Sequence, residues 1–256
     1  MKRFLILIFL FFFLNEGQAA ENNGKIIMTF SEWIPMAQVD SWGNGYGLMP
    51  EIAKAVFEDE LGISVGFRVR PWKRAQIDVE KGRSDFMITV ATESRKRYAL
   101  PSTKPFYKLP LYIYTYAGHE KLEAINGIQS AEDIKALKLI PVTNLGNGWH
   151  KDNIDAHGIN THYVGKEESI LMFLASKRAD IMIDAVVPTN YLIKIKELNR
   201  KIVLTKCRFS QVDFHLLLSR KSSFANRMKD INAAFERAEQ KGRIQDIVLK
   251  YESDSN

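Results

Sequence analysis

Cysteine is almost absent from this sequence, since Cys207 is the only one among 256 residues. A single cysteine allows no internal disulfide, so the chain is unlike the disulfide-rich modules of extracellular proteins. No cysteine stands near the amino terminus either, where a lipid anchor would be attached. We expect Cys207 to be a buried residue of a strand.

Long apolar runs are equally scarce, and the one that stands out extends from Phe4 to Leu14 behind two basic residues. It is too short to span a membrane comfortably, because a spanning helix needs about 20 apolar residues. Followed by the small residues Gly17 and Ala19, it predicts a signal peptide over residues 1–20. We therefore expect the protein to be exported to the periplasm as a soluble chain.

Motifs that mark catalytic and cofactor sites are also missing. The chain contains no Walker loop, no dinucleotide-binding G-x-G-x-x-G and no H-E-x-x-H. His150, His157 and His162 lie seven and five residues apart, which places no obvious pair on one helix face. We interpret them as surface or loop residues rather than metal ligands. The sequence thus predicts a protein that is not an enzyme and has no cofactor and no metal.

The formal charge is +6, but the positive residues are spread along the chain. The densest cluster comprises Arg68, Arg70, Lys73 and Arg74, and such a cluster would suit phosphate contacts. An exported protein does not meet the usual nucleic acids, and charge runs are often solvated faces. We therefore expect no nucleic-acid partner.

Apolar runs alternate with helical patterns in the first part of the chain. They predict strands over 25–30, 64–70 and 85–90, a helix that starts near Pro50, and a helix over 72–81 that Gly82 ends. A strand–helix–strand–helix–strand order is typical of a parallel, doubly wound sheet.

A second α/β unit begins at Gly118, after a strand that leads into it over 109–116. In this unit, Ser130 is predicted to cap a short helix together with Asp133, and 180–185 is predicted to be a buried strand. Two further strands and two final helices are predicted over 201–207, 212–219, 224–240 and 242–251. We divide the chain into one lobe of residues 21–112 with 208–256, and another of residues 113–207.

Arg95 is the most suggestive polar residue, because it follows the buried strand 85–90 within the turn from Thr92 to Arg95. Ligands of open α/β sheets bind beyond the carboxyl ends of parallel strands. The planar guanidinium is suited to a carboxylate. The alternative is that Arg95 lies on a solvated turn with Lys96 and Arg97.

Several segments together carry a resemblance to a known family. They are Trp33 with Pro35, PWKRAQ (71–76) followed by KGRSD (81–85), TESR (92–95), KRADIMIDA (177–185), FHLLLSRKSSF (214–224) and KGRIQDIVLKY (241–251). With these segments the chain resembles the bacterial extracellular solute-binding proteins of family 3, in particular a branch with PWxRA. These are periplasmic amino-acid-binding components of ABC transporters, with sensor domains among their relatives. The resemblance implies a type II periplasmic-binding-protein-like fold, in which two α/β lobes joined by two crossing strands close on a ligand in the cleft.

The resemblance also implies roles for individual residues. Arg95 corresponds to the arginine that pairs with the ligand α-carboxylate, and Asp184 to the acid that receives the α-ammonium. Trp33 and Trp72 correspond to the two aromatic residues that enclose the ligand side chain, and Gly148 lies near a turn whose amides meet the carboxylate. The alternatives are that Asp184 caps the helix that follows it and that both tryptophans are core residues.

One position departs from the family pattern. Five residues before Arg95 the family usually has serine or threonine, which holds the ligand carboxylate, whereas this chain has Val90. The lost hydrogen bond to an ionised group would cost about 1.5–3 kcal/mol if nothing replaces it. Our hypothesis is that the hydroxyl of Thr92 compensates.

These observations lead us to expect a monomeric binding protein that captures an amino acid or a similar zwitterion and presents it to the permease of an ABC importer. One alternative is a sensory module that reports to a membrane receptor. Another is a small dehydratase-like enzyme on the same fold, for which Glu32, Glu93, Glu167 and Asp184 would be the candidate acids and bases.

Overall fold

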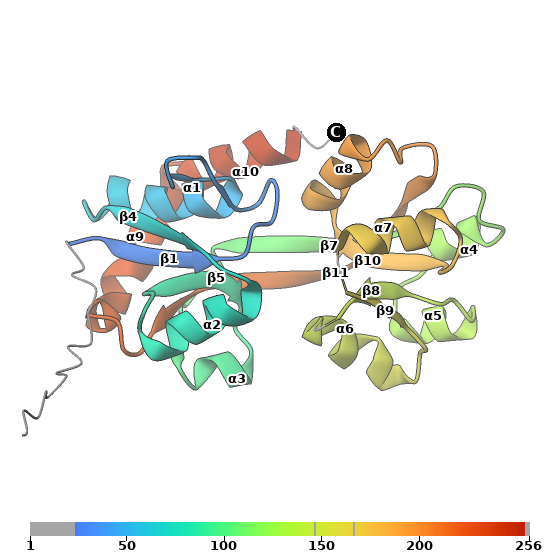
Figure 1. Ribbon diagram of the computed structural model, residues 1–256, viewed down its shortest axis with the longest axis horizontal. Coiled ribbons are helices and arrows are strands. Elements are labelled where there is room, and N and C mark those ends of the chain that lie inside the picture. The colour runs from blue at the N-terminus through green and yellow to red at the C-terminus, as the bar shows by residue number, and fades with distance from the viewer. Residues whose placement is uncertain (1–23, 146, 166, 254–256) are drawn as a thin grey trace, which may run out of the picture.

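One mixed sheet of seven strands runs through the computed structural model, which describes residues 24–145, 147–165 and 167–253. Six strands follow the order β10-β7-β11-β5-β1-β4, and β6 pairs with β11 outside this path. The strands are β1 (Ile26–Phe30), β4 (Val65–Val69), β5 (Phe86–Val90), β6 (Ala99–Pro101), β7 (Tyr107–Tyr116), β10 (Ile181–Ala185) and β11 (Ile202–Ser219). The long strands β7 and β11 connect two groups of elements (Figure 1). We call the group with β1, β4 and β5 the first lobe and the group with β10 the second lobe.

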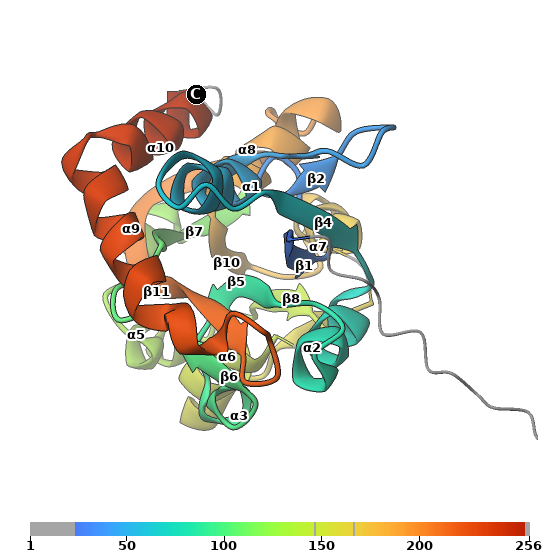
Figure 2. The same cartoon turned by 90° about the vertical axis from the view of Figure 1, so that its left-hand side faces the viewer.

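Helices cover both faces of the sheet in the first lobe (Figure 2). One face carries α1 (Leu48–Lys54), its π-helical continuation (Ala55–Asp59), α9 (Met228–Gln240) and α10 (Arg243–Ser253), while the other carries α2 (Trp72–Lys81) and α3 (Glu93–Lys96). A small hairpin of β2 (Gln38–Val39) and β3 (Gly45–Tyr46) follows β1. As predicted, β1, β4 and β5 are parallel, but β11 pairs with β5 in the antiparallel sense, so the whole sheet is mixed.

The strand predicted over 85–90, which is β5, is covered on both sides. Phe86 and Ile88 of β5 belong to the main core, which includes residues of α1 and α9, whereas Met87 packs with Val79 of α2 on the opposite face. Gly82 ends α2 at a φ of 75°, a left-handed conformation that glycine adopts without steric cost. The sequence pattern and the packing therefore agree along this strand and the helix before it.

The second lobe is built on β10, on the ends of β7 and β11, and on the parallel pair of β8 (Val142–Asn144) and β9 (His162–Val164). A parallel bridge between Pro141 and Ile181 joins this pair to β10. The helices are α4 (Leu122–Asn126), α5 (Ala131–Ala136), α6 (Gly148–Asn153), α7 (Glu167–Ala175) and α8 (Val186–Ile195). The predicted capping box of Ser130 and Asp133 is present at the start of α5. Short 3-10 turns occupy Asp155–His157 and Ala225–Arg227.

The crossing strand β11 corrects the prediction of two separate strands over 201–207 and 212–219. It is one strand of 18 residues, and irregularities between Leu204 and Arg208 and between Arg208 and Ser210 interrupt its regular pairing with β7. Irregular residues of this kind break the apolar–polar alternation by which a strand is recognised in a sequence, without ending the ladder. α10 packs beside α1, and α9 beside the π-helical segment, so both final helices lie on the first lobe. The exact lobe boundaries stay a prediction.

Two further predictions concern membrane insertion and Cys207. Cys207 is buried in β11, as predicted, and its thiol donates a hydrogen bond to the Ile128 carbonyl at 2.9 Å. Within the described ranges, no helix combines the length and the apolar character that crossing a membrane requires. The predicted signal peptide lies outside the described residues.

Candidate functional site

The carboxyl ends of the strands of the two lobes face each other. β5 is antiparallel to β11, which is antiparallel to β7, so β1, β4 and β5 run in the direction of β7, toward the second lobe. β10 is antiparallel to β7 and therefore runs toward the first lobe, and β8 and β9 run with it. Every site residue predicted from the sequence lies near one of these facing ends, namely Trp33, Trp72, Val90, Thr92 and Arg95 on the first lobe and Gly148 and Asp184 on the second.

The strand register estimates how far apart the two halves of the site are. Val90 pairs with Phe214, which in turn pairs with Tyr107, whereas Asp184 pairs with Tyr112. Tyr107 and Tyr112 are five positions apart on β7, which is about 17 Å along an antiparallel strand. A small ligand therefore cannot touch both strand ends through backbone contacts alone, and side chains must reach toward it from each lobe.

The register also decides which face of the sheet these side chains share. Thr89 pairs with His215 of β11, so the two side chains lie on the same face of the sheet. Lys108 and Tyr112 of β7 also lie on this face. Tyr112 pairs with Asp184. Thr89, which contacts the Arg95 side chain, and Asp184 therefore lie on one face of the twisted sheet.

Arg95 is half-buried and held against the first lobe. Its Nε donates to Oε1 of Gln76 at 3.2 Å, and its Nη1 donates to the Val90 carbonyl at 2.9 Å and to Oγ1 of Thr89 at 3.5 Å. Its guanidinium carbon lies 5.3 Å from the ring centroid of Trp72. Burial lowers the pKa of Arg95, and Tyr98 beside it acts in the opposite direction. Arg95 is therefore a positioned cation rather than a residue of a solvated turn.

The positive charge of Arg95 is not paired within the described part of the chain, where no carboxylate forms an ion pair with it. Neighbouring cations differ in this respect. Arg83 lies 2.8 Å from a carboxylate oxygen of Asp78, and Lys96 lies 2.7 Å from one of Glu93. Arg95 can therefore pair with the anionic group of a ligand without first breaking an ion pair.

Val90 and Thr92 both support Arg95 in the structure. The Val90 side chain offers no hydroxyl, but its carbonyl orients the guanidinium. Thr92 is the N-cap residue of α3, where its hydroxyl accepts a hydrogen bond from the Arg95 backbone N–H at 3.4 Å and lies 2.9 Å from the Ser94 hydroxyl. The hypothesis that Thr92 replaces the missing hydroxyl toward the ligand stays a prediction.

The two tryptophans are half-buried, which suits neither a pure core role nor a free surface position. The ring of Trp33 lies 6.1 Å from that of Phe214 on β11. Trp72 packs against the cluster of Val79 and Met87 under α2. Each indole therefore rests on the first lobe or the crossing strand and keeps part of its surface open.

Asp184 is the penultimate residue of β10. Its Oδ1 accepts a hydrogen bond from the Ala185 N–H at 2.7 Å. Burial raises the pKa of Tyr114, and the charge of Asp184 contributes to that rise. The N-cap residue of α8 is Ala185, and no side chain of the described residues makes a capping bond there, so Asp184 does not fill the N-cap position.

Gly148 begins α6 at the facing end of β8 and is exposed. Its neighbour Asn147 is the N-cap residue, and the Asn147 side chain accepts a hydrogen bond from the His150 N–H at 3.1 Å. From the sequence, Gly148 is expected only to lie near a turn. The structure adds a short helix whose second residue, Trp149, meets Phe209 of β11 at a centroid distance of 6.4 Å.

The interpretation of His150 as a surface or loop residue is wrong. His150 is fully buried, its Nε2 lies 3.0 Å from Oγ1 of Thr161, and its Nδ1 has no hydrogen-bond partner among the described residues. Burial lowers the pKa of His150 to about 4, so the ring is neutral at pH 7. The side chains of His157 and His162 are exposed. No three potential ligands gather into a metal site among the residues whose structure is described.

One segment of the chain matches a motif of catalytic serines. Residues 62–66 match G-x-S-x-G. A catalytic serine of this motif occupies a tight turn from a strand into a helix. Ser64 instead precedes β4 and is exposed, so the segment is not such a turn.

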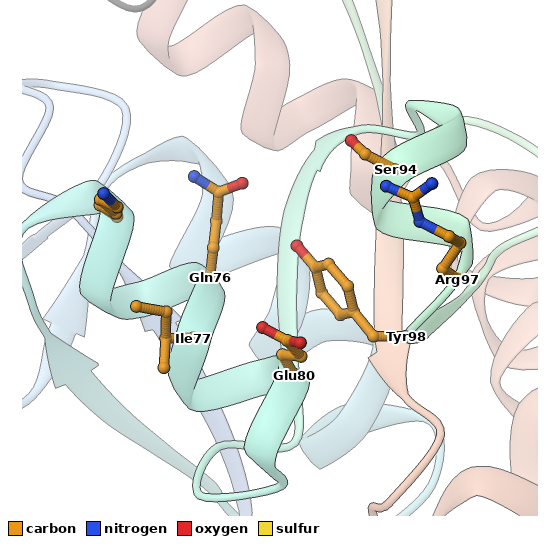
Figure 3. A pocket seen from close by; sticks show the side chains of 7 residues that line it. Gln76, Ile77, Glu80, Ser94, Arg97 and Tyr98 are labelled. Carbon is orange, nitrogen blue, oxygen red and sulfur yellow. The ribbon is translucent and has the colours of Figure 1, made fainter.

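A surface pocket of about 640 Å³ lies on the first lobe between α2 and α3 (Figure 3). Gln76 and Glu80 reach into it from α2, and Ser94, Arg97 and Tyr98 do so from the opposite side. The pocket does not contain the predicted ligand residues, but it shares Gln76 with the environment of Arg95. A smaller pocket of about 340 Å³ is lined from both lobes, with Tyr112 and Val187 on one side and Glu252 on the other.

Sequence reasoning missed five residues around the site, namely Gln76, Tyr98, Trp149, Phe209 and Phe214. A signal for Gln76 was present, because residues four positions apart lie on the same helix face and Gln76 follows Trp72 at this spacing. Phe209 carries no such signal, because it lies in the irregular stretch of the crossing strand between Arg208 and Ser210.

Comparison with known proteins gives a consistent result. The family model of the bacterial extracellular solute-binding proteins, family 3, matches residues 26–254. Among proteins with curated descriptions, none matches this sequence. Solved structures do match it, and three of them illustrate the range of similar proteins.

An ancestral arginine-binding protein bound to glutamine is 21% identical to the chain, with a TM-score of 0.67, and the match covers 89% of this chain and 97% of that one. The probable amino-acid ABC transporter extracellular-binding protein ytmK from Bacillus subtilis is 17% identical, with a TM-score of 0.71 and coverage of 91% and 98%. A histidine kinase sensor domain with similarity to periplasmic binding proteins is 17% identical, with a TM-score of 0.68 and coverage of 89% and 95%. Such low identities show the fold alone, which is of the type II periplasmic-binding-protein kind.

Proposed function

The chain belongs to the bacterial extracellular solute-binding proteins of family 3, and we propose that it captures a small zwitterion, an amino acid or a close analogue, in the periplasm. The observation that carries this proposal is the placement of two charged residues. Arg95, which has no carboxylate partner in the described part of the chain, and Asp184 lie at facing strand ends of different lobes and on one face of the sheet.

This placement suggests how binding and closure are coupled. Arg95 offers hydrogen-bond donors to a carboxylate, and Asp184 offers an acceptor to an ammonium group. A molecule that carries both groups gains both contacts only when the lobes approach each other. Since a ligand shifts a conformational equilibrium by its differential affinity for the two states, a zwitterion favours the closed state more than an ion with one charge.

We further propose that the protein delivers its ligand to the permease of an ABC importer as a monomer. The similarity to ytmK, a probable amino-acid ABC transporter extracellular-binding protein, supports this role. The similarity to a histidine kinase sensor domain supports the alternative of a sensory module. We infer binding rather than turnover because Arg95, the charged residue positioned at the end of β5, is a guanidinium, which does not serve as a general base at neutral pH.

The first test is a thermal-shift screen with the amino acids, followed by calorimetry on wild type, Arg95→Ala and Asp184→Ala. A ligand at a hundredfold its dissociation constant adds about 2.7 kcal/mol of stability. We expect a zwitterion to bind to wild type and to lose at least tenfold in affinity in each variant. Wild-type affinity in either variant would contradict the zwitterion model.

The role in transport requires a second measurement. Deletion of the gene is expected to reduce uptake of the radiolabelled ligand, and a plasmid copy is expected to restore it. Unchanged uptake, together with loss of a transcriptional response to the ligand, would favour the sensory alternative.

A further inference from the structure

The contacts of Arg95 restrict which ligands the first lobe can accept. The Gln76 side chain accepts a hydrogen bond from Nε of Arg95 at 3.2 Å, and the Val90 carbonyl accepts one from Nη1 at 2.9 Å. The edge formed by Nε and Nη2 is therefore partly used by the protein itself. Nη1 also donates to Oγ1 of Thr89 at 3.5 Å, so the protein's own contacts limit how a ligand carboxylate can approach the guanidinium.

The same contacts determine how much of the Trp72 ring is left for a ligand. The guanidinium lies over the indole at 5.3 Å from its centroid, which is within the range of a cation–π contact. The indole also packs against the apolar cluster of Val79 and Met87. Trp72 thus contacts both the protein's own cation and the apolar cluster.

Tyr98 completes this arrangement. It packs against the same apolar cluster as Trp72, and with Gln76 it lines the pocket between α2 and α3 (Figure 3). Burial raises the pKa of Tyr98, although the charge of Arg95 beside it acts in the opposite direction. Gln76 and Tyr98 therefore flank Arg95 from the side of the pocket, and we class both as positioning residues.

We propose that Gln76 and Tyr98 hold Arg95 on Trp72 so that the site accepts a carboxylate whose side chain carries no positive charge, and disfavours ligands with cationic side chains. A cationic side chain that approached Trp72 would meet the guanidinium, which is of the same charge and already covers the ring. This inference rests on the proposed function and narrows it.

Matched ligands test the proposal directly. L-Arginine and L-citrulline have nearly the same shape, but only arginine carries a positive side chain, and L-lysine and L-norleucine form a second pair. All four are measured by calorimetry beside the remaining standard amino acids. We expect the tightest ligand to be neutral or acidic, and to bind at least tenfold more tightly than arginine, lysine or ornithine.

The possible outcomes separate this proposal from the proposed function. If arginine or lysine binds most tightly, the charge selection is wrong while the proposed function stands. If no zwitterion binds, the proposed function fails and the charge selection falls with it.

Variants at Gln76 test the positioning role. Gln76→Glu places a carboxylate beside the Nε of Arg95, and we expect it to reduce the affinity for the best ligand at least tenfold by neutralising the guanidinium. Gln245→Glu is the control, because Gln245 is an exposed residue of α10 and adds the same charge away from the site. Gln245→Glu is expected to bind like wild type.

A measurement without any ligand completes the test. In nitrogen–proton NMR spectra, the Nε–H signal of Arg95 is expected to be protected from exchange in wild type and to shift or disappear in Gln76→Leu. Thermal unfolding verifies that each variant is folded. An unchanged Arg95 signal together with unchanged affinity in Gln76→Leu would overturn the role of Gln76, and a Gln76→Glu variant that binds like wild type would do the same.

Discussion

The buried ring of His150 makes the stability of the second lobe depend on pH. His150 is fully buried in α6, and burial lowers its pKa to about 4, with the nearby charge of Asp155 acting in the opposite direction. Thr161 and Tyr163 are its other neighbours in this part of the lobe. In the unfolded chain the same histidine has a pKa of about 6.5. The unfolded state therefore binds a proton at pH values at which the folded state does not.

The magnitude follows from these two pKa values. The contribution of His150 to stability is complete above about pH 6.5 and is lost as the pH falls, because protons then favour the unfolded chain. Between pH 8 and pH 5 the loss is about 2 kcal/mol, and below pH 4 it approaches about 3 kcal/mol, since one pKa unit corresponds to about 1.36 kcal/mol. This is a large fraction of the stability of an ordinary domain.

Urea denaturation at pH 8 and pH 5 measures this loss in wild type, in His150→Gln and in His162→Gln. Glutamine keeps a hydrogen-bonding group for Thr161 but does not titrate, so we expect the drop in unfolding free energy to be smaller by about 2 kcal/mol in His150→Gln. His162 has an exposed side chain, and its variant is expected to follow wild type. Identical drops in wild type and His150→Gln would refute the reasoning.

Three further predictions concern the site and the core. Arg95→Lys is expected to bind the ligand at least tenfold more weakly by calorimetry, because an ammonium cannot reproduce the planar donor group, and affinity within twofold of wild type would contradict this. Trp33→Ala and Trp72→Ala are expected to weaken binding. Each is expected to lower the free energy of unfolding by less than about 3 kcal/mol, which is the smallest loss usual for a buried aromatic residue. Larger losses in urea denaturation would identify both as core residues. Phe235→Ala is expected to cost about 3–5 kcal/mol, since Phe235 is buried and stacks on Phe106 at 4.2 Å, and a loss below about 1 kcal/mol would contradict the packing.

Much of the first lobe could be predicted because its signals are local. The apolar run before Val90 is a buried strand, and Gly82 ends the helix before it at the expected residue. The capping box of Ser130 and Asp133 is of the same kind, since both partners lie within one helical turn. Such features depend on neighbours in the sequence and survive in the folded chain.

The features that the sequence did not predict depend on distant partners. The hydrogen bond of Arg95 to Gln76 joins two residues 19 positions apart, and the ring of Trp33 meets Phe214 on a strand from the other end of the chain. The spacing of His150 to the other histidines does not indicate its burial, which results from packing near Thr161 and Tyr163. Spacing along one helix carries no information on such contacts.

The departure at Val90 shows how this limit affects the reading of function. From the sequence, a valine in place of a hydroxyl residue means a lost hydrogen bond to the ligand, which would cost about 1.5–3 kcal/mol. In the structure the Val90 carbonyl accepts from Nη1 of Arg95, and the N-cap hydroxyl of Thr92 orders the turn that carries the arginine. The first lobe therefore keeps a firmly oriented guanidinium although it lacks the hydroxyl. A weaker affinity than in relatives would then come from one missing contact to the ligand, and not from a disordered arginine.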